Sequence, residues 1–201
     1  MKHERSQALF EYWDSVRAGR RAPRRLEIEP GAIAPHLPNI FILERLDEGS
    51  CRVRLAGTQL CSYCGQELRG RLFTSLWPVE ERAQIESLLA SVTEDASGAV
   101  AGIEGREPQG RTARFELLLL PLATSDGKFD RVLGTISAID PPYWLGGWPV
   151  VAWSLKSSRI LWPSGQPPAL TDVPPVRTLS AVSAPRKRLT VIDGGLSGHG
   201  D

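Results

Sequence analysis

Alternation of apolar and polar residues is the feature that most restricts the fold of this chain. It occurs in two segments before a stretch of helical periodicity and in three segments after it. The early pair is "NIFILERL" (residues 39–46) and "CRVRLA" (residues 51–56), with the turn signal "DEGS" between them. In the second segment Val53 and Leu55 point to one face, and the arginines between them point to the other. The early pair therefore predicts a β-hairpin.

The late segments are "GAVAGIEGRE" (98–107), "TARFELLLLPLA" (112–123) and "DRVLGTISAID" (130–140). Short turns containing Gly110 and Gly127 separate them, as a meander of antiparallel strands requires. Two early and three late strands must share one sheet to bury their apolar faces.

Helical periodicity fills the space between the two groups of strands. "TQLCSYCGQEL" (58–68) has apolar residues three to four apart, and we expect Thr58 to cap this short helix and Gly65 to end it. "PVEERAQIESLLASV" (78–92) carries the clearest apolar stripe in the chain. These helices must cover one face of the sheet.

A further helix is expected at the start of the chain, over residues 6–19. Its apolar stripe contains Leu9 and Trp13, Ser6 is the expected N-cap, and Gly19 is the expected C-cap. Such a helix exposes its stripe unless something covers it, so we expect a homodimer formed through this helix.

The fold class predicted is α+β: a five-stranded antiparallel sheet with helices on one face, an N-terminal helix and an irregular C-terminal tail. The folded domain is expected over residues 6–145. Residues 146–201 contain repeated Gly, Pro, Ser and Thr, so we expect an irregular and largely disordered tail there.

Composition and charge limit the classes of partner and the location that we expect for this chain. The formal net charge is +1, so no overall field attracts the chain to nucleic acid. No apolar run reaches the roughly 20 residues that span a bilayer, so no membrane insertion is expected. The first residues lack the apolar core of a secretory signal, and three cysteines do not suggest a disulfide framework. We therefore expect a cytoplasmic protein.

Cys61 and Cys64 form a CxxC pair, for which two interpretations stay open. A redox pair would gain reactivity from the N-terminus of a helix, but this pair lies inside or near the end of a short helix. A zinc site would need two further ligands. Helical spacing also fits two packed thiols that face the sheet. We expect packed thiols and no metal.

Motifs for catalysis are missing from the sequence. It contains no G-x-S-x-G, no P-loop, no H-E-x-x-H and no dinucleotide-binding glycine fingerprint. His36 precedes the first strand, where a loop residue is expected rather than a haem ligand. We predict no enzyme, no catalytic residue and no cofactor. The basic cluster of residues 17–25 is either a solvated helix end or a surface for a protein partner.

Four segments together resemble a known family. They are "YWDSVRAGRRAPRRLEIEP" (12–30), "HLPNIFILE" (36–44), "RVRLAGTQLCSYCGQELRGR" (52–71) and "LLLPL" (118–122). They are similar to segments of the short, stand-alone PAS-like proteins of alphaproteobacteria, and the order of strands and helices is similar to that of a PAS domain. The resemblance implies a sensory or protein-interaction module of bacterial signal transduction, which binds a small ligand or a signalling partner. It supplies no catalytic residue.

A PAS ligand would lie inside the helical flank. The candidates that would line such a pocket are Leu60, Tyr63, Leu68, Phe73 and Leu76. Whether these side chains surround a cavity or fill a core stays open. Two alternative functions also stay open: a carrier of a small molecule, and a thiol redox protein that uses Cys61 and Cys64.

Overall fold

The structure, a computed structural model, describes residues 1–46 and 49–162. The helices are α1 (Glu4–Arg17), η1 (Arg25–Glu27), η2 (Pro30–Asn39), α2 (Thr58–Cys64), η3 (Phe73–Leu76) and α3 (Val79–Glu94), of which the η elements are 3-10 helices. The strands are β1 (Ile40–Arg45), β2 (Cys51–Ala56), β3 (Gly98–Arg106), β4 (Thr112–Leu122), β5 (Arg131–Ile139) and β6 (Ala152–Leu161).

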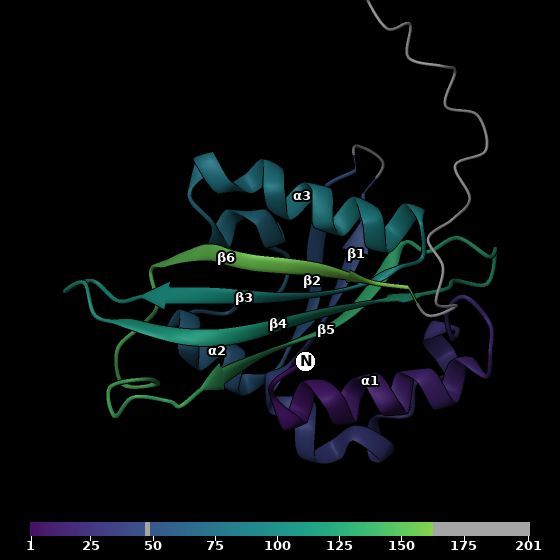
Figure 1. The fold of residues 1–201 in the computed structure, drawn as a ribbon, viewed down its shortest axis with the longest axis horizontal. Helices are drawn as coiled ribbons and strands as arrows, with labels where there is room; N and C mark the ends of the chain where they lie inside the picture. Colours follow the sequence, from purple (N-terminus) through teal and green to yellow (C-terminus); the bar gives the residue numbers. More distant parts are fainter. Residues whose placement is uncertain (47–48, 163–201) are drawn as a thin grey trace, which may run out of the picture. The chain divides into compact units, whose positions relative to one another are not determined.

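One antiparallel sheet organises the described part of the chain, with strand order β2-β1-β5-β4-β3-β6 (Figure 1). The predicted hairpin β1–β2 and the predicted meander β3–β4–β5 are both confirmed. They join through β1 and β5, where Phe41 lies opposite Gly134. Two groups of strands far apart in the sequence therefore form a single layer.

The sheet has six strands rather than the five predicted. The sixth, β6, pairs with β3 along its whole length, and it lies in the segment from residue 146 that was predicted to be irregular. Gly147 and Pro149 directly before it interrupt the sequence pattern, while Trp153 and Leu155 still point to the core cluster. The prediction of an irregular tail is therefore wrong for Ala152–Leu161, and residues 163–201 of the predicted tail lie outside the described residues.

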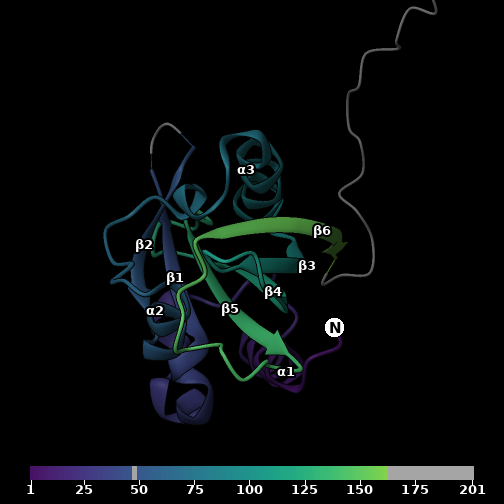
Figure 2. The same ribbon diagram turned by 90° about the vertical axis from the view of Figure 1, so that its left-hand side faces the viewer.

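The sheet separates two apolar clusters. The inner face carries α2, η3 and α3, as predicted for the helical flank, and the outer face carries α1 (Figure 2). In the inner cluster α3 contributes Ile85, Leu89 and Val92. In the outer cluster α1 contributes Leu9 and Trp13.

Both predicted caps of the first helix are wrong. The helix begins earlier: His3 is the N-cap, and its Nδ1 accepts a hydrogen bond from the backbone N–H of Arg5 over 3.1 Å. Ser6 is buried inside the helix instead. At the other end Ala18 takes the left-handed conformation with φ of 49°, one residue before Gly19 at φ of 80°. A side chain can therefore replace the expected glycine at the end of this helix, at the cost of some strain.

The turn from β2 into the helical flank depends on Gly57. A Cβ at this position would lie 2.2 Å from the carbonyl oxygen of Leu37, so only glycine fits. The backbone N–H of Gly57 donates to the carbonyl oxygen of Ile40 over 2.7 Å, which ties the turn to β1. Gly57 rather than Thr58 is the N-cap of α2, and Gly65 ends the helix with φ of 62°, as predicted. The chain is thereby directed onto the inner face.

Candidate functional site

The space between the helical flank and the inner face of the sheet is filled by six aromatic side chains, which we call the aromatic layer. They are Phe41, Tyr63, Phe73, Trp77, Phe115 and Trp153. Phe115 of β4 contacts two of the others, with ring centroids 5.5 Å from Tyr63 and 4.8 Å from Trp153. Tilted and edge-on contacts at these distances are favourable beyond the area that they bury. The aromatic layer therefore holds α2 and η3 against the sheet, with Phe41, Phe115 and Trp153 contributed by strands β1, β4 and β6.

The five residues predicted to line a ligand pocket all belong to the inner cluster, where each is buried. They are Leu60, Tyr63, Leu68, Phe73 and Leu76. The structure thus brings together residues that are up to 16 positions apart, in the helical flank where the PAS resemblance placed them. Tyr63 and Phe73 are themselves members of the aromatic layer.

A pocket of about 310 Å³ lies at the edge of the aromatic layer, which we call the edge pocket. Leu76 is the one predicted residue that lines it, together with Cys64, Pro149 and Trp153 among others. The indole Nε1 of Trp153 is buried beside the sulfur of Cys64, a weak acceptor, and no stronger acceptor among the described residues bonds to it. A buried donor without a strong acceptor is costly, so an acceptor in this pocket would be stabilised.

The three cysteines are free thiols, and each environment makes the thiolate less favourable. Burial raises the pKa of Cys64 to about 12 and that of Cys51 to about 11. Burial also raises the pKa of Cys61, and the neighbouring Glu67 carboxylate, whose Oε1 lies 3.8 Å from the sulfur, adds to this effect. A nucleophilic or metal-binding cysteine needs the opposite shift.

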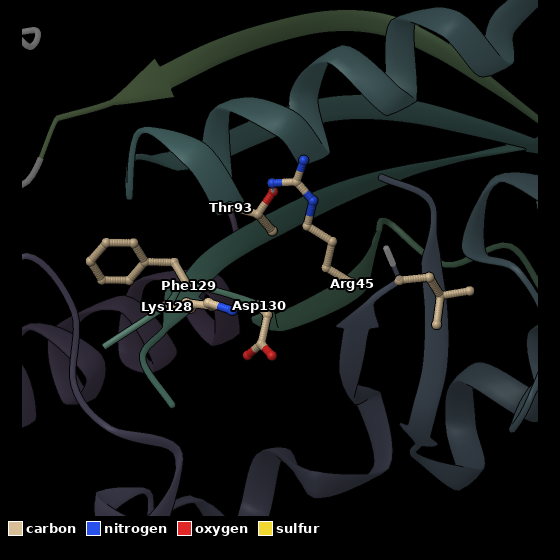
Figure 3. Close-up of a pocket in the computed structure, with 6 residues that line it drawn as sticks. Arg45, Thr93, Lys128, Phe129 and Asp130 are labelled. Atoms are coloured by element: carbon tan, nitrogen blue, oxygen red, sulfur yellow. Dashed lines mark hydrogen bonds between the residues drawn. The ribbon is translucent and has the colours of Figure 1, made fainter. Parts of the chain in front are cut away.

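A second pocket, of about 390 Å³, lies where β1 ends beside α3 (Figure 3). Arg45 extends from β1 toward α3, where its guanidinium donates to Thr93 Oγ1 over 3.1 Å and pairs with Glu94. Lys128 and Asp130 line the pocket from the segment that leads into β5. Arg45 is therefore already bound to α3. We interpret its contacts with Thr93 and Glu94 as a polar brace, which connects the end of β1 to the helical flank beside this pocket.

The basic cluster of residues 17–25 makes mainly local contacts. Arg17 pairs with Asp14, and Arg20 pairs with Glu27. Arg21 donates to the carbonyl oxygen of Asp95 over 2.6 Å. Three of the five arginines are thus engaged within the chain.

Sequence reasoning missed a group of aromatic rings around Arg111. Its guanidinium lies within 6.0 Å of the ring centroids of Tyr143, Trp144 and Trp148. The buried carboxylate of Glu107 accepts a hydrogen bond from Arg111 Nε over 3.0 Å. The "PPYWLGGW" segment and the β3–β4 turn are adjacent only in the folded chain, so no local pattern could have revealed this contact.

Sequence reasoning also missed the role of Glu116 on the outer face of β4. This side chain is buried, and it accepts the backbone N–H of Lys2 over 2.6 Å and that of His3 over 3.1 Å. A carboxylate at the start of a helix also meets the positive end of the helix dipole. Glu116 therefore anchors the start of α1 on the sheet.

Within residues 1–46 and 49–162, no three His, Cys, Asp or Glu side chains are grouped so that they could hold a metal ion. None of the helices described there is long and apolar enough to cross a membrane.

A PAS-type module is defined by an antiparallel sheet of order β2-β1-β5-β4-β3 and by a helical flank that lies, in sequence, between β2 and β3. A family described as "PAS domain" matches residues 1–137, more than half of the chain. The chain therefore belongs to the PAS domain family. Modules of this family are generally sensory signalling domains without catalytic activity.

Solved structures of low sequence identity are also similar to the chain. A light-oxygen-voltage domain studied with a flavin analogue is 15% identical, with a TM-score of 0.44, and the match covers 56% of this chain and 85% of that one. The light-oxygen-voltage protein of Rhodobacter sphaeroides is 16% identical with a TM-score of 0.44, and 68% and 70% of the two chains are covered. The PAS domain of an HTR-like protein from Haloarcula marismortui is 20% identical with a TM-score of 0.40, and the match covers 57% and 95%. A search of curated proteins gave no match.

Proposed function

We propose that this chain is a non-catalytic PAS module of bacterial signal transduction that signals by contact with a protein partner. The observation that carries the proposal is the aromatic layer, which occupies the space where a PAS module would hold a ligand. A module with a filled interior has to receive or pass on its signal at its surface. Its signalling partner is then a protein that recognises the folded domain.

The location we propose is the bacterial cytoplasm. The resemblance to stand-alone PAS-like proteins of alphaproteobacteria supports a bacterial origin. The low net charge of +1 and the engaged arginines support a protein partner rather than a nucleic acid.

A homodimer is a second form of contact that we propose for this module. The apolar stripe of α1 is occupied, because Leu9 and Trp13 pack on its own sheet and Trp13 Nε1 donates to the carbonyl oxygen of Pro121 over 2.8 Å. A dimer through α1 would use the partly buried Phe10 and Tyr12 at the margin of this contact. Light scattering tests it: a strict monomer at high concentration contradicts the dimer.

A carrier of a small molecule is the second candidate function. The observation in its favour is the edge pocket, whose wall contains the predicted residue Leu76 and Trp153, an indole N–H donor with only the weak Cys64 sulfur beside it. A small apolar ligand with one hydrogen-bond acceptor would fit this chemistry. The third candidate, thiol redox chemistry at Cys61 and Cys64, has less support, since burial raises the pKa of both thiols.

Three measurements separate these functions. The tagged chain is isolated from its native cell after mild crosslinking, and native mass spectrometry is recorded on the uncrosslinked protein. We expect a stoichiometric protein partner and the bare mass of the chain. A stoichiometric small molecule that Trp153→Phe releases would support the carrier, and the absence of any protein partner would contradict the interaction module. Fast alkylation of Cys61 and Cys64 at neutral pH would support redox chemistry.

A further inference from the structure

α1 covers only part of the outer face, and a groove of about 550 Å³ lies where the cover ends. We call it the outer groove. Its walls come from β3, β4, the end of β5, β6 and the first residues of the chain. The start of the chain lies on the α1 side of the sheet (Figure 2), where Glu116 binds the backbone of Lys2 and His3. The groove is therefore bounded by a fixed element at one end.

The floor of the outer groove is apolar, and it is deepest where a glycine supplies no side chain. Val100 and Ile139 supply apolar side chains, and between them Gly102 supplies none. A Cβ at Gly102 would lie 2.9 Å from Ser157 Oγ of β6, so the hollow is narrow at this point. The backbone of Gly102 needs no left-handed conformation, because its φ lies outside that region. The missing side chain therefore serves the shape of the groove rather than a turn.

The rim of the outer groove is basic. Four positively charged side chains line it, namely Lys2, Arg114, Lys156 and Arg159. Two of them form exposed ion pairs, Arg114 with Asp140 and Lys156 with Glu104, each over 3.2 Å. Exposed pairs of this kind are weak and exchange readily with other carboxylates. The one carboxylate that lines the groove, Glu116, is already bound to backbone N–H groups.

We infer that the outer groove binds an acidic, amphipathic segment of a partner protein, which places an apolar side chain over Gly102 and carboxylates against the basic rim. This inference rests on the proposed function and specifies the chemistry of its partner. Charge complementarity selects the occupant: four basic groups surround an apolar floor, and Asp and Glu side chains on either side of a leucine or phenylalanine would match both. A groove of this kind beside a fixed helix is the arrangement in which peptides commonly bind.

The test selects binders without assuming a sequence. A library of random peptides is displayed on phage and selected against the immobilised full chain, and each enriched peptide is labelled and titrated by fluorescence anisotropy. We expect peptides that combine Asp or Glu with Leu, Ile or Phe. Arg159→Glu is expected to weaken their binding about tenfold or more, equivalent to one lost contact, and Gly102→Val is expected to abolish it.

Lys128→Glu is the matched control, because it makes the same change of charge on an exposed lysine outside the groove. It should leave binding unchanged. Thermal unfolding of each variant shows that the fold is intact, and Ser157 Oγ can rotate away from a valine at position 102. If Gly102→Val does not fold, Arg159→Glu alone decides the result.

Several outcomes would overturn the inference. These are a failure to enrich peptides, enriched peptides without acidic residues, and peptides that bind both groove variants as well as the wild type. If the chain binds phosphatidylglycerol vesicles more tightly than the selected peptides, and the groove variants abolish this vesicle binding, the groove would be assigned to lipid. A dimer that Gly102→Val dissociates would assign it to a second copy of the chain. If the partner from the native cell binds the groove variants normally, the interaction module stands and only the groove assignment fails.

Discussion

The two faces of the sheet are built from the same alternating strands, yet they end in different states. The inner face is closed by α2, η3 and α3, and the aromatic layer fills the space beneath them. The outer face is covered by α1 and the 3-10 helix η2, which leave the outer groove at the β3–β6 side. The comparison indicates that the inner face mainly stabilises the fold, while the outer face is available for recognition.

The largest expected effect is on the inner face. Phe115→Ala removes a fully buried ring that touches Tyr63 and Trp153, so we expect a loss of about 3–5 kcal/mol in the free energy of unfolding. Urea denaturation measures it. Phe129→Ala is the control, because Phe129 is only partly buried beside Arg21 and should cost much less. Equal losses in the two variants would show that the inner layer is not the main source of stability.

The next effect concerns the anchor of α1 on the outer face. Glu116→Gln removes the charge that holds the backbone N–H groups of Lys2 and His3, and we expect a loss of about 2 kcal/mol. Hydrogen exchange should rise at the start of α1 and stay unchanged in α3. The control is Glu104→Gln, which removes only an exposed ion pair with Lys156. Exchange that rises equally in both helices would contradict a local anchor.

A pH dependence distinguishes the buried thiols from reactive ones. The folded-state pKa of Cys64 is about 12 and that of Cys51 about 11, against an ordinary value of 9.0 that applies in the unfolded chain. The unfolded state therefore loses its thiol protons first as the pH rises, so the free energy of unfolding is unaffected below pH 9.0 and falls between pH 9.0 and about 11–12.

At one pH unit above the ordinary thiol pKa, each buried thiol should lower the free energy of unfolding by about 1 kcal/mol. Urea denaturation across this range measures the slope, and Cys64→Ala should make it shallower. If the variant and the wild type lose stability in parallel, the thiol is not the group that titrates.

The smallest effect is expected where the flank meets the end of β1. Arg45→Gln breaks the ion pair with Glu94, and partly exposed pairs of this kind contribute below about 1 kcal/mol. Gln is too short to reach Thr93, but the Thr93 hydroxyl still donates to the carbonyl oxygen of Leu89, so the fold should be unchanged. A loss as large as that of Phe115→Ala would mean that the polar brace, rather than the aromatic layer, holds the flank in place.

Much of the fold could be predicted from local patterns. Alternation located five of the six strands, and Gly65 marked the end of α2 as expected. The caps of the first helix were wrong for a physical reason. His3 replaced Ser6 because the helix starts where Glu116 of β4 can bind its first N–H groups, and that carboxylate is over 110 residues away in the sequence.

The candidate site could be predicted only in part. Helical spacing placed Leu60 on the inward face of its helix, and the PAS resemblance placed Leu68 beside it; both belong to one buried cluster. It could not show that aromatic rings from five separate elements would pack beside them, since that depends on how β6 docks. The outer groove was missed because it depends on a glycine and on charges that converge from distant elements.

The sequence alone determined the antiparallel layer, the helical flank and the absence of common catalytic motifs, because these follow from the periodicity and spacing of neighbouring residues. The tertiary structure decided that β6 extends the sheet, that rings fill the inner space and that Glu116 holds α1. These features join residues far apart in the chain, and their positions are set by the packing of the whole domain rather than by any local pattern.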